Sequence, residues 1–186
     1  MSEEKGKVIL VTGGSGSGKS LFSEKLLEDE KEILYIATAV VNDEESERRV
    51  EHHKNRRDER YRTHEGFEEL ANMIENAKED TVLLDCISLF VRNHMFKQNR
   101  DYDFISLDEV DEIKNCIEEE LKSIINICRE KNKKLVMVTN EVGYSVVPEF
   151  KVNRIFRNLI GTTNQLMASL SDKVYLVSCG IPITLK

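Results

Sequence analysis

Residues 7–20 read KVILVTGGSGSGKS, a short apolar run that leads directly into a glycine-rich loop. The loop fits the pattern G-x-x-x-x-G-K-[ST], which binds nucleotide phosphates when a strand precedes it and a helix follows it. In such a P-loop the glycines let backbone N–H groups surround phosphate oxygens, the lysine bridges the β- and γ-phosphates, and the final hydroxyl binds Mg²⁺. The sequence therefore predicts that ATP or GTP is held with Mg²⁺ by Gly13, Gly14, Ser15, Gly16, Ser17, Gly18, Lys19 and Ser20.

Strand-like apolar runs alternate with helical patterns along the rest of the chain. Strands are expected at residues 7–12, 33–37, 81–85, 135–139 and 173–177, and an antiparallel C-terminal edge strand at 183–186. Helices are expected at 19–28, about 43–57, 67–76, 108–130 and about 150–170, with a polar loop at 97–105. Such alternation is typical of a mostly parallel central sheet with helices on both faces. It predicts a single α/β domain over residues 1–186, of the RecA-like P-loop NTPase type.

The composition narrows the possible functions. The 186 residues are enough for one such domain with a sizeable core. The formal net charge is -7 and the basic residues crowd between Arg48 and Arg62, so no nucleic-acid partner is expected. The four cysteines lack the spacing of a zinc site or a disulfide framework. The apolar run before the P-loop is too short for a signal peptide or a membrane span, which predicts a soluble cytoplasmic protein.

A carboxylate stands where a P-loop protein needs one. Asp85 closes the apolar run at 81–85, and a carboxylate at the end of such a buried strand holds Mg²⁺ directly or through water. An alternative role is to cap a helix that starts at Ile87, and the two roles are compatible. The guanine-reading motif N-K-x-D of GTPase switches is missing, since Asn132-Lys133 lacks the aspartate and Asn140-Glu141 lacks the lysine. A GTPase switch is therefore not expected.

The segment RRVEHHKNRRDERYRTHE, residues 48–65, contains His52, His53 and His64. A neutral imidazole is abundant near pH 7 and can attack phosphorus, forming a phosphoramidate that passes its group on. The neighbouring basic side chains would stabilise the charge that develops on phosphate oxygens. Composition alone favours the alternative, a solvated pair of histidines on a charged helix.

Together these motifs resemble one family, the bifunctional adenosylcobinamide kinase/adenosylcobinamide-phosphate guanylyltransferase of cobalamin biosynthesis. The resemblance runs from end to end, and the order and spacing of the motifs make it specific. It rests on GGSGSGKS at 13–20, YIATA at 35–39, RVEHHK at 49–54, RTHE at 62–65, LLDCI at 83–87, TNEVG at 139–143 and GIP at 180–182.

The resemblance implies two reactions. The first is phosphorylation of the aminopropanol hydroxyl of adenosylcobinamide by a nucleoside triphosphate. In the second, GMP passes from GTP to a histidine, with loss of pyrophosphate, and then to adenosylcobinamide phosphate. The implied nucleophile is His52, with Lys19 as the second catalytic residue, and the partner is a corrinoid whose cobalt arrives with the substrate. The implied guanine-nucleotide contacts are Ala37, Thr38, Ala39, His53, Lys54, Asn55, Arg56, Glu65 and Asp85. The family also implies a homotrimer.

The chain departs from the family pattern at three positions. Tyr61 stands in place of the usual tryptophan, Ser145 in place of a glycine, and Asp85 in place of the glutamate of some relatives. Two other functions remain open at this point. One is a P-loop small-molecule kinase without guanylyl transfer, and the other is a non-catalytic nucleotide-binding regulator.

Overall fold

The computed structural model describes residues 6–39 and 58–186. The helix expected at about 43–57 lies outside these residues, as do His52, His53, Lys54, Asn55 and Arg56. No helix within the described ranges combines the length and the apolar character needed to cross a membrane.

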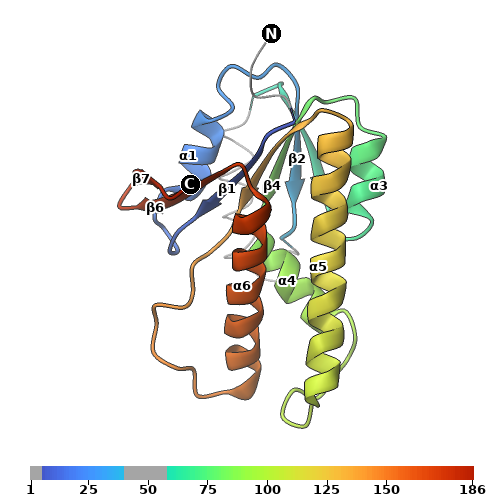
Figure 1. Cartoon of the computed structure of the whole chain (residues 1–186), viewed down its shortest axis with the longest axis vertical. Helices are drawn as coiled ribbons and strands as arrows, with labels where there is room; N and C mark the ends of the chain where they lie inside the picture. Colours follow the sequence, from blue (N-terminus) through green and yellow to red (C-terminus); the bar gives the residue numbers. More distant parts are fainter. Residues whose placement is uncertain (1–5, 40–57) are drawn as a thin grey trace.

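A seven-stranded sheet forms the centre of the described structure (Figure 1), with the strand order β3-β2-β4-β5-β1-β6-β7. All neighbouring strands are parallel except β6 and β7, which form an antiparallel pair at one edge. The predicted mostly parallel α/β fold is therefore confirmed. The strands are β1 (Val8–Thr12), β2 (Ile33–Ala37), β3 (Tyr61–Glu65), β4 (Thr81–Asp85), β5 (Lys134–Val138), β6 (Lys173–Ser178) and β7 (Ile181–Thr184).

The helices cover both faces of the sheet, as predicted. They are α1 (Lys19–Lys25), α3 (Leu70–Glu75), α4 (Ile87–Phe96), α5 (Leu107–Glu130) and α6 (Lys151–Leu170). Alternate strand residues such as Val8 and Leu10 belong to a core shared with α3, α4, α5 and α6, while Ile9 and Val11 pack on the α1 side. The interiors of β1, β2, β4 and β5 are buried on both faces, which explains their continuous apolar runs. Figure 1 shows α5 and α6 extending side by side well beyond the end of the sheet.

Two elements were not predicted. β3 reads YRTHE and has no apolar run, because it is an edge strand whose residues are exposed or half-buried. Only Cys86 separates helix α4 from β4, so the sequence has no polar loop there that would mark the start of a new element. Its N-terminus had been considered only as a site that Asp85 might cap.

The C-terminal edge strand was predicted in the correct place relative to the sheet but two residues late. Cys179 and Gly180 both have positive φ angles, 52° and 78°, and form the turn between β6 and β7. A two-residue turn with two positive φ angles matches the twist of an antiparallel hairpin. Pro182 therefore lies within β7 rather than in the turn, where it is tolerated because β7 is an edge strand.

Candidate nucleotide-binding site

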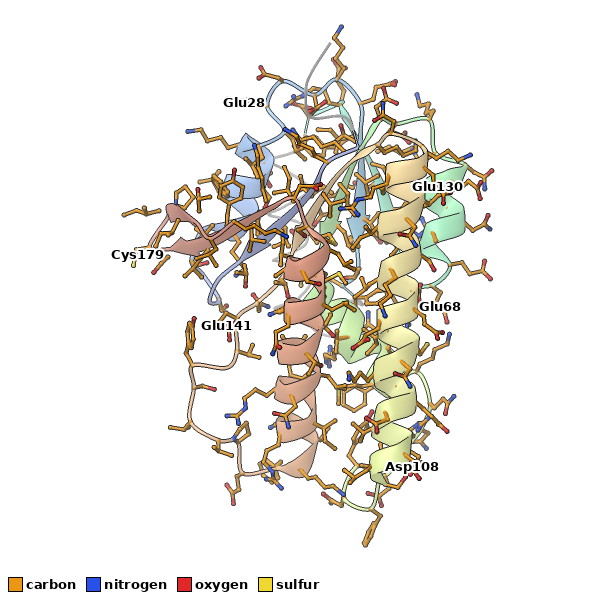
Figure 2. The ribbon with its side chains drawn as sticks, viewed as in Figure 1. Glu28, Glu68, Asp108, Glu130, Glu141 and Cys179 are labelled. Atoms are coloured by element: carbon orange, nitrogen blue, oxygen red, sulfur yellow. The ribbon has the colours of Figure 1, made fainter. Side chains whose placement is uncertain are left out.

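The P-loop connects β1 to α1, as predicted, and two other segments hold it in place. The backbone N–H of Gly180 donates to the carbonyl oxygen of Ser17 over 2.8 Å, and that of Glu141 donates to the carbonyl oxygen of Gly13 over 3.0 Å. Glu141 follows β5 and Gly180 follows Cys179 in the β6–β7 turn (Figure 2). The loop therefore lies between two connections of the sheet that fix its backbone.

Lys19, the one charged residue of this loop, is buried, with 8% of its surface exposed. Its Nζ donates to the carbonyl oxygen of Gly14 over 2.5 Å, so the side chain folds back over the loop. Burial lowers the pKa of the Lys19 ammonium, whereas the nearby Cys86 and Asp85 side chains oppose this shift. The ammonium thus lies where a phosphate oxygen bound in the loop could replace the carbonyl as its partner.

Asp85 points from the end of β4 toward the P-loop. Its Oδ2 accepts hydrogen bonds from Ser20 Oγ over 3.5 Å and from Tyr35 OH over 3.3 Å. Helix α4 begins after Cys86 and has no side-chain cap, so Asp85 does not cap it. Hydroxyl and carboxylate oxygens are the donors that Mg²⁺ prefers, and the pair formed by Ser20 and Asp85 therefore fits this ion.

The remaining described candidates lie along the same edge of the sheet. Ala37 is paired in register with Glu65 of β3 on one side and with Asp85 of β4 on the other. Thr38 and Ala39 continue directly from Ala37, and the Thr38 N–H donates to the carbonyl oxygen of Asp85 over 3.2 Å. Glu65 is exposed and Ala39 is partly buried. These residues come together because parallel strands present their carboxyl ends at one edge, where α/β proteins bind ligands.

A hydrogen-bonded series of polar side chains lies next to this edge of the sheet. Cys86 Sγ lies 3.0 Å from Ser88 Oγ, and Asn140 Nδ2 donates to the same oxygen over 2.8 Å. Asn164 of α6 donates to the carbonyl oxygen of Asn140 over 3.1 Å and accepts from Thr139 Oγ1 over 2.7 Å. Burial raises the pKa of the Cys86 thiol to about 11, so the thiol stays neutral between Lys19 and Asp85.

None of the supporting residues Ser88, Asn140 and Asn164 was predicted as a site residue. Ser88 and Asn140 follow β4 and β5, and Asn164 lies in α6. Many polar residues occupy such positions, and the sequence does not indicate which of them point toward the site. The motif TNEVG at 139–143, which contributed to the family resemblance, was the available signal for Asn140.

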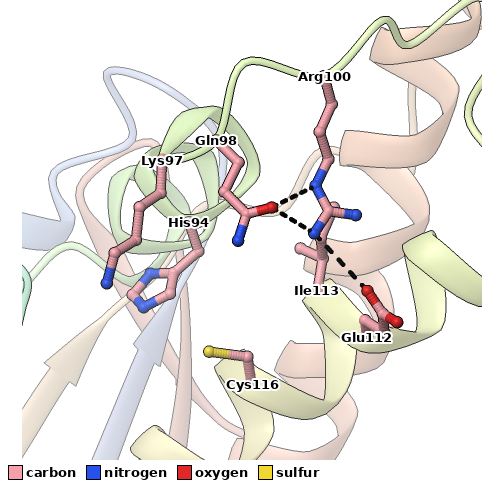
Figure 3. Close-up of a pocket in the computed structure, with 7 residues that line it drawn as sticks. All are labelled: His94, Lys97, Gln98, Arg100, Glu112, Ile113 and Cys116. Atoms are coloured by element: carbon pink, nitrogen blue, oxygen red, sulfur yellow. Dashed lines mark hydrogen bonds and ion pairs between the residues drawn. The ribbon is translucent and has the colours of Figure 1, made fainter.

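A separate pocket of about 200 Å³ lies between the C-terminal end of α4 and α5. It is lined by His94, Lys97, Gln98, Arg100, Glu112, Ile113 and Cys116 (Figure 3). Its nitrogen-bearing side chains lie beside carboxylates: Lys97 pairs with Glu68, Arg100 lies 3.7 Å from Glu112, and His94 Nε2 lies 2.9 Å from Glu120 Oε2. It contains none of the predicted site residues.

The P-loop between a parallel strand and a helix, with a carboxylate beside its serine, defines a P-loop protein of the α/β class. Residues 9–185 match the model of the family described as cobinamide kinase / cobinamide phosphate guanyltransferase, and the chain belongs to this family of transferases. The family suggested by the sequence motifs is thus confirmed.

Three curated relatives are similar over almost their whole length. The "Bifunctional adenosylcobalamin biosynthesis protein CobU" of Salmonella typhimurium is 39% identical over 181 residues, which cover 96% of this chain and 99% of the relative. The protein of the same name from Escherichia coli is 39% identical over 183 residues, with the same coverage. The "Bifunctional adenosylcobalamin biosynthesis protein CobP" of Pseudomonas aeruginosa is 29% identical over 180 residues, covering 95% of this chain and 96% of the relative.

Proposed function

We propose that this chain, as a single domain, carries out the two reactions that its family description names. It phosphorylates adenosylcobinamide with a nucleoside triphosphate and then transfers GMP from GTP to adenosylcobinamide phosphate, giving adenosylcobinamide-GDP. The observation that carries the proposal is the convergence of Lys19, Ser20 and Asp85 beside the P-loop, in a chain that matches the family over residues 9–185. We further propose a cytoplasmic homotrimer, on the strength of the family resemblance.

In the kinase reaction the substrate hydroxyl gives up its proton to water and attacks the γ-phosphorus, and the bond between this phosphorus and the β-phosphate oxygen breaks. The P-loop N–H groups and the Lys19 ammonium hold the phosphates in line for this displacement. Ser20 Oγ and Asp85 would hold Mg²⁺, directly or through water, and the ion would offset negative charge on the phosphate oxygens. Burial of Lys19 strengthens its attraction for phosphate, because little water competes for the ammonium.

In the guanylyl transfer the imidazole of His52 attacks the α-phosphorus of GTP and pyrophosphate leaves. The substrate phosphate then attacks the same phosphorus, and the bond between nitrogen and phosphorus breaks. The same cradle serves both reactions, because pyrophosphate is a leaving group that the P-loop and Lys19 are suited to hold. The proposed guanine-nucleotide contacts are Ala37, Ala39, His53, Lys54, Asn55, Arg56, Glu65 and Asp85, and Thr38 lies between the first two in the chain.

The test is mass spectrometry of the purified protein after incubation with GTP and Mg²⁺. The parent is expected to gain one acid-labile GMP and His52→Ala to gain none. The neighbouring variant His53→Ala loses a proposed nucleotide contact but keeps the nucleophile, so it should still gain the adduct at saturating GTP. Cobinamide phosphorylation should persist in His52→Ala. No adduct on the parent, with GTP shown to bind, would favour a kinase without guanylyl transfer.

A second variant tests the shared phosphate cradle. Lys19→Ala should lower both activities by at least about 100-fold, since the ammonium stabilises charge in both displacements. Nucleotide binding without any cobinamide-dependent turnover in the parent would instead identify a non-catalytic regulator. Light scattering of the purified protein measures the mass of the assembly and so tests the homotrimer.

A further inference from the structure

Thr38 was expected to contact nucleotide, yet its side chain is fully buried, with 0% of the residue surface exposed. The hydroxyl both donates to and accepts from Cys86, the residue that follows the neighbouring strand β4. Thr38 Oγ1 donates to the carbonyl oxygen of Cys86 over 2.7 Å and accepts from the Cys86 N–H over 2.9 Å. One small side chain thus holds both backbone groups of the residue that follows Asp85.

This contact continues the sheet beyond its last regular pair. The ladder between β2 and β4 ends with Ala37 opposite Asp85, after which only the Thr38 N–H reaches back to the Asp85 carbonyl. Beyond this point the Thr38 hydroxyl, rather than a strand backbone, supplies the hydrogen bonds to the backbone of Cys86. The Cys86 carbonyl oxygen also accepts from Phe90 N in the first turn of α4, whereas Thr38 is the hydrogen-bond partner given by the structure for the Cys86 N–H.

The backbone of Thr38 is itself held by a side chain of helix α4. Asn93 of α4 donates from Nδ2 to the Thr38 carbonyl oxygen over 2.7 Å. The backbone on either side of Asp85 is therefore fixed, by the strand ladder before it and by Thr38 after it. From this fixed backbone the Asp85 carboxylate extends to Ser20 Oγ, 3.5 Å away, and to the Tyr35 hydroxyl, 3.3 Å away.

We propose that Thr38 is a positioning residue that aims the Asp85 carboxylate at the P-loop, and that its hydroxyl does not contact nucleotide. The inference rests on the proposed role of Asp85 in holding Mg²⁺. When the hydroxyl is removed, the Cys86 peptide loses its buried partner, and the backbone that carries the carboxylate is held less firmly. The defect should therefore appear only in binding that depends on Mg²⁺.

The experiment compares nucleoside triphosphate affinity with Mg²⁺ and with EDTA, by calorimetry, for the parent, Thr38→Val and Thr38→Ser. Valine keeps the shape of threonine without the hydroxyl, and serine keeps the hydroxyl. Thr38→Val should bind about tenfold more weakly with Mg²⁺ and within about twofold of the parent in EDTA, while Thr38→Ser should bind like the parent. Equal weakening in both conditions would indicate direct contact with nucleotide and overturn the proposal.

A double-mutant cycle with Asp85→Asn separates this inference from the proposed function. If Thr38 acts through Asp85, Thr38→Val adds no further loss of Mg²⁺-dependent affinity in the Asp85→Asn background. A loss that persists there overturns the positioning role alone. An Asp85→Asn variant with the Mg²⁺ dependence of the parent overturns the role of Asp85 and the inference with it.

Asn93→Ala keeps the proposal testable if Thr38→Val does not fold. It removes the 2.7 Å hydrogen bond to the Thr38 carbonyl and leaves the hydroxyl in place. A selective weakening of about threefold with Mg²⁺ supports the proposal. Unchanged affinity in both conditions overturns it.

Discussion

Gly13 and Val177 approach so closely that no side chain fits between them. A Cβ built on Gly13 would lie 2.3 Å from the Val177 carbonyl oxygen and 2.8 Å from Ser17 Oγ, and the Gly13 φ angle is 152°. The backbone oxygen belongs to β6 and cannot rotate away. The glycine is therefore required by the packing of the P-loop against the sheet, independently of any bound phosphate.

Gly13→Ala should consequently destabilise the protein even without nucleotide. We expect a loss of about 1–3 kcal/mol in the free energy of unfolding, because the P-loop must shift away from β6. Gly161→Ala is the control, since a Cβ there meets nothing within 4 Å and the residue lies inside α6. It should stabilise the protein by about 0.5–1 kcal/mol. Urea unfolding measures both, and an equal change in the two variants would contradict the steric argument.

Arg62 and Glu79 form a pair that makes stability depend on pH. Arg62 donates from Nε and Nη2 to the two carboxylate oxygens of Glu79 over 2.6 and 2.8 Å, and Glu79 is 1% exposed. The Arg62 hydrogen bond holds the pKa of Glu79 below its ordinary value of 4.5. The stabilisation is therefore fully present above about pH 4.5 and is lost as the pH falls through the lower pKa of the folded state.

Arg62→Met should thus lower the free energy of unfolding at pH 7, and the difference from the parent should shrink below pH 4.5. We expect about 2 kcal/mol, below the ~3–5 kcal/mol for breaking a fully buried pair, because the arginine is half exposed. Lys131→Met is the matched control: both side chains of its pair with Glu75 are about half exposed, and the pair should contribute less than about 1 kcal/mol. A difference that stays constant from pH 7 to pH 3 would rule out the pair as its cause.

The sequence predicted those parts of the fold that local pattern determines. β1, β2, β4 and β5 appear as apolar runs because both of their faces are buried, and the P-loop is a motif of adjacent residues. β3 escaped prediction because an edge strand needs no apolar run. Asp85 was predicted from its place at the end of a strand, but its approach to Ser20 joins residues 65 positions apart and depends on the packing of the sheet.

The role of Thr38 shows the limit of sequence reasoning most clearly. The family resemblance placed this residue near the nucleotide, and the strand order does bring it to the edge that carries the P-loop. Which way its hydroxyl points depends on the register of β2 against β4, and that register is set by the burial of whole strands. No local pattern around Thr38 contains this information.

The cysteines should divide into two reactive and two protected thiols. Cys116 and Cys179 are exposed, whereas Cys86 and Cys128 are buried. Burial raises the thiol pKa of Cys86 to about 11 and that of Cys128 to about 12, which leaves almost no thiolate at pH 8. Because the thiolate is the reactive form, titration with a disulfide reagent at pH 8 should modify Cys116 and Cys179 quickly and the buried pair only in denaturant. Rapid modification of a Cys116→Ser, Cys179→Ser double variant would contradict this assignment.

Asn164 connects helix α6 to the segment that follows β5. Its amide accepts a hydrogen bond from Thr139 Oγ1 and donates one to the Asn140 carbonyl oxygen. The next residue, Glu141, donates from its backbone N–H to the Gly13 carbonyl oxygen in the P-loop. Asn164→Ala should therefore destabilise the protein, because the Thr139 hydroxyl and the Asn140 carbonyl lose their partners. Asn158→Ala is a matched control on the same helix, since Asn158 is exposed and both changes bring the same gain in helix propensity.

The difference between these two variants isolates the hydrogen bonds from the propensity of the helix. Asn158→Ala should raise the free energy of unfolding by a few tenths of a kcal/mol, and Asn164→Ala should fall about 1–3 kcal/mol below it. Because Asn140 precedes Glu141, the shift should also reach the P-loop and weaken nucleotide binding in Asn164→Ala alone. Urea unfolding together with calorimetric titration of the nucleotide measures both effects. Equal stabilities would mean that water replaces the Asn164 amide, whereas lower stability with unchanged nucleotide affinity would show that the strand end and the P-loop are not coupled.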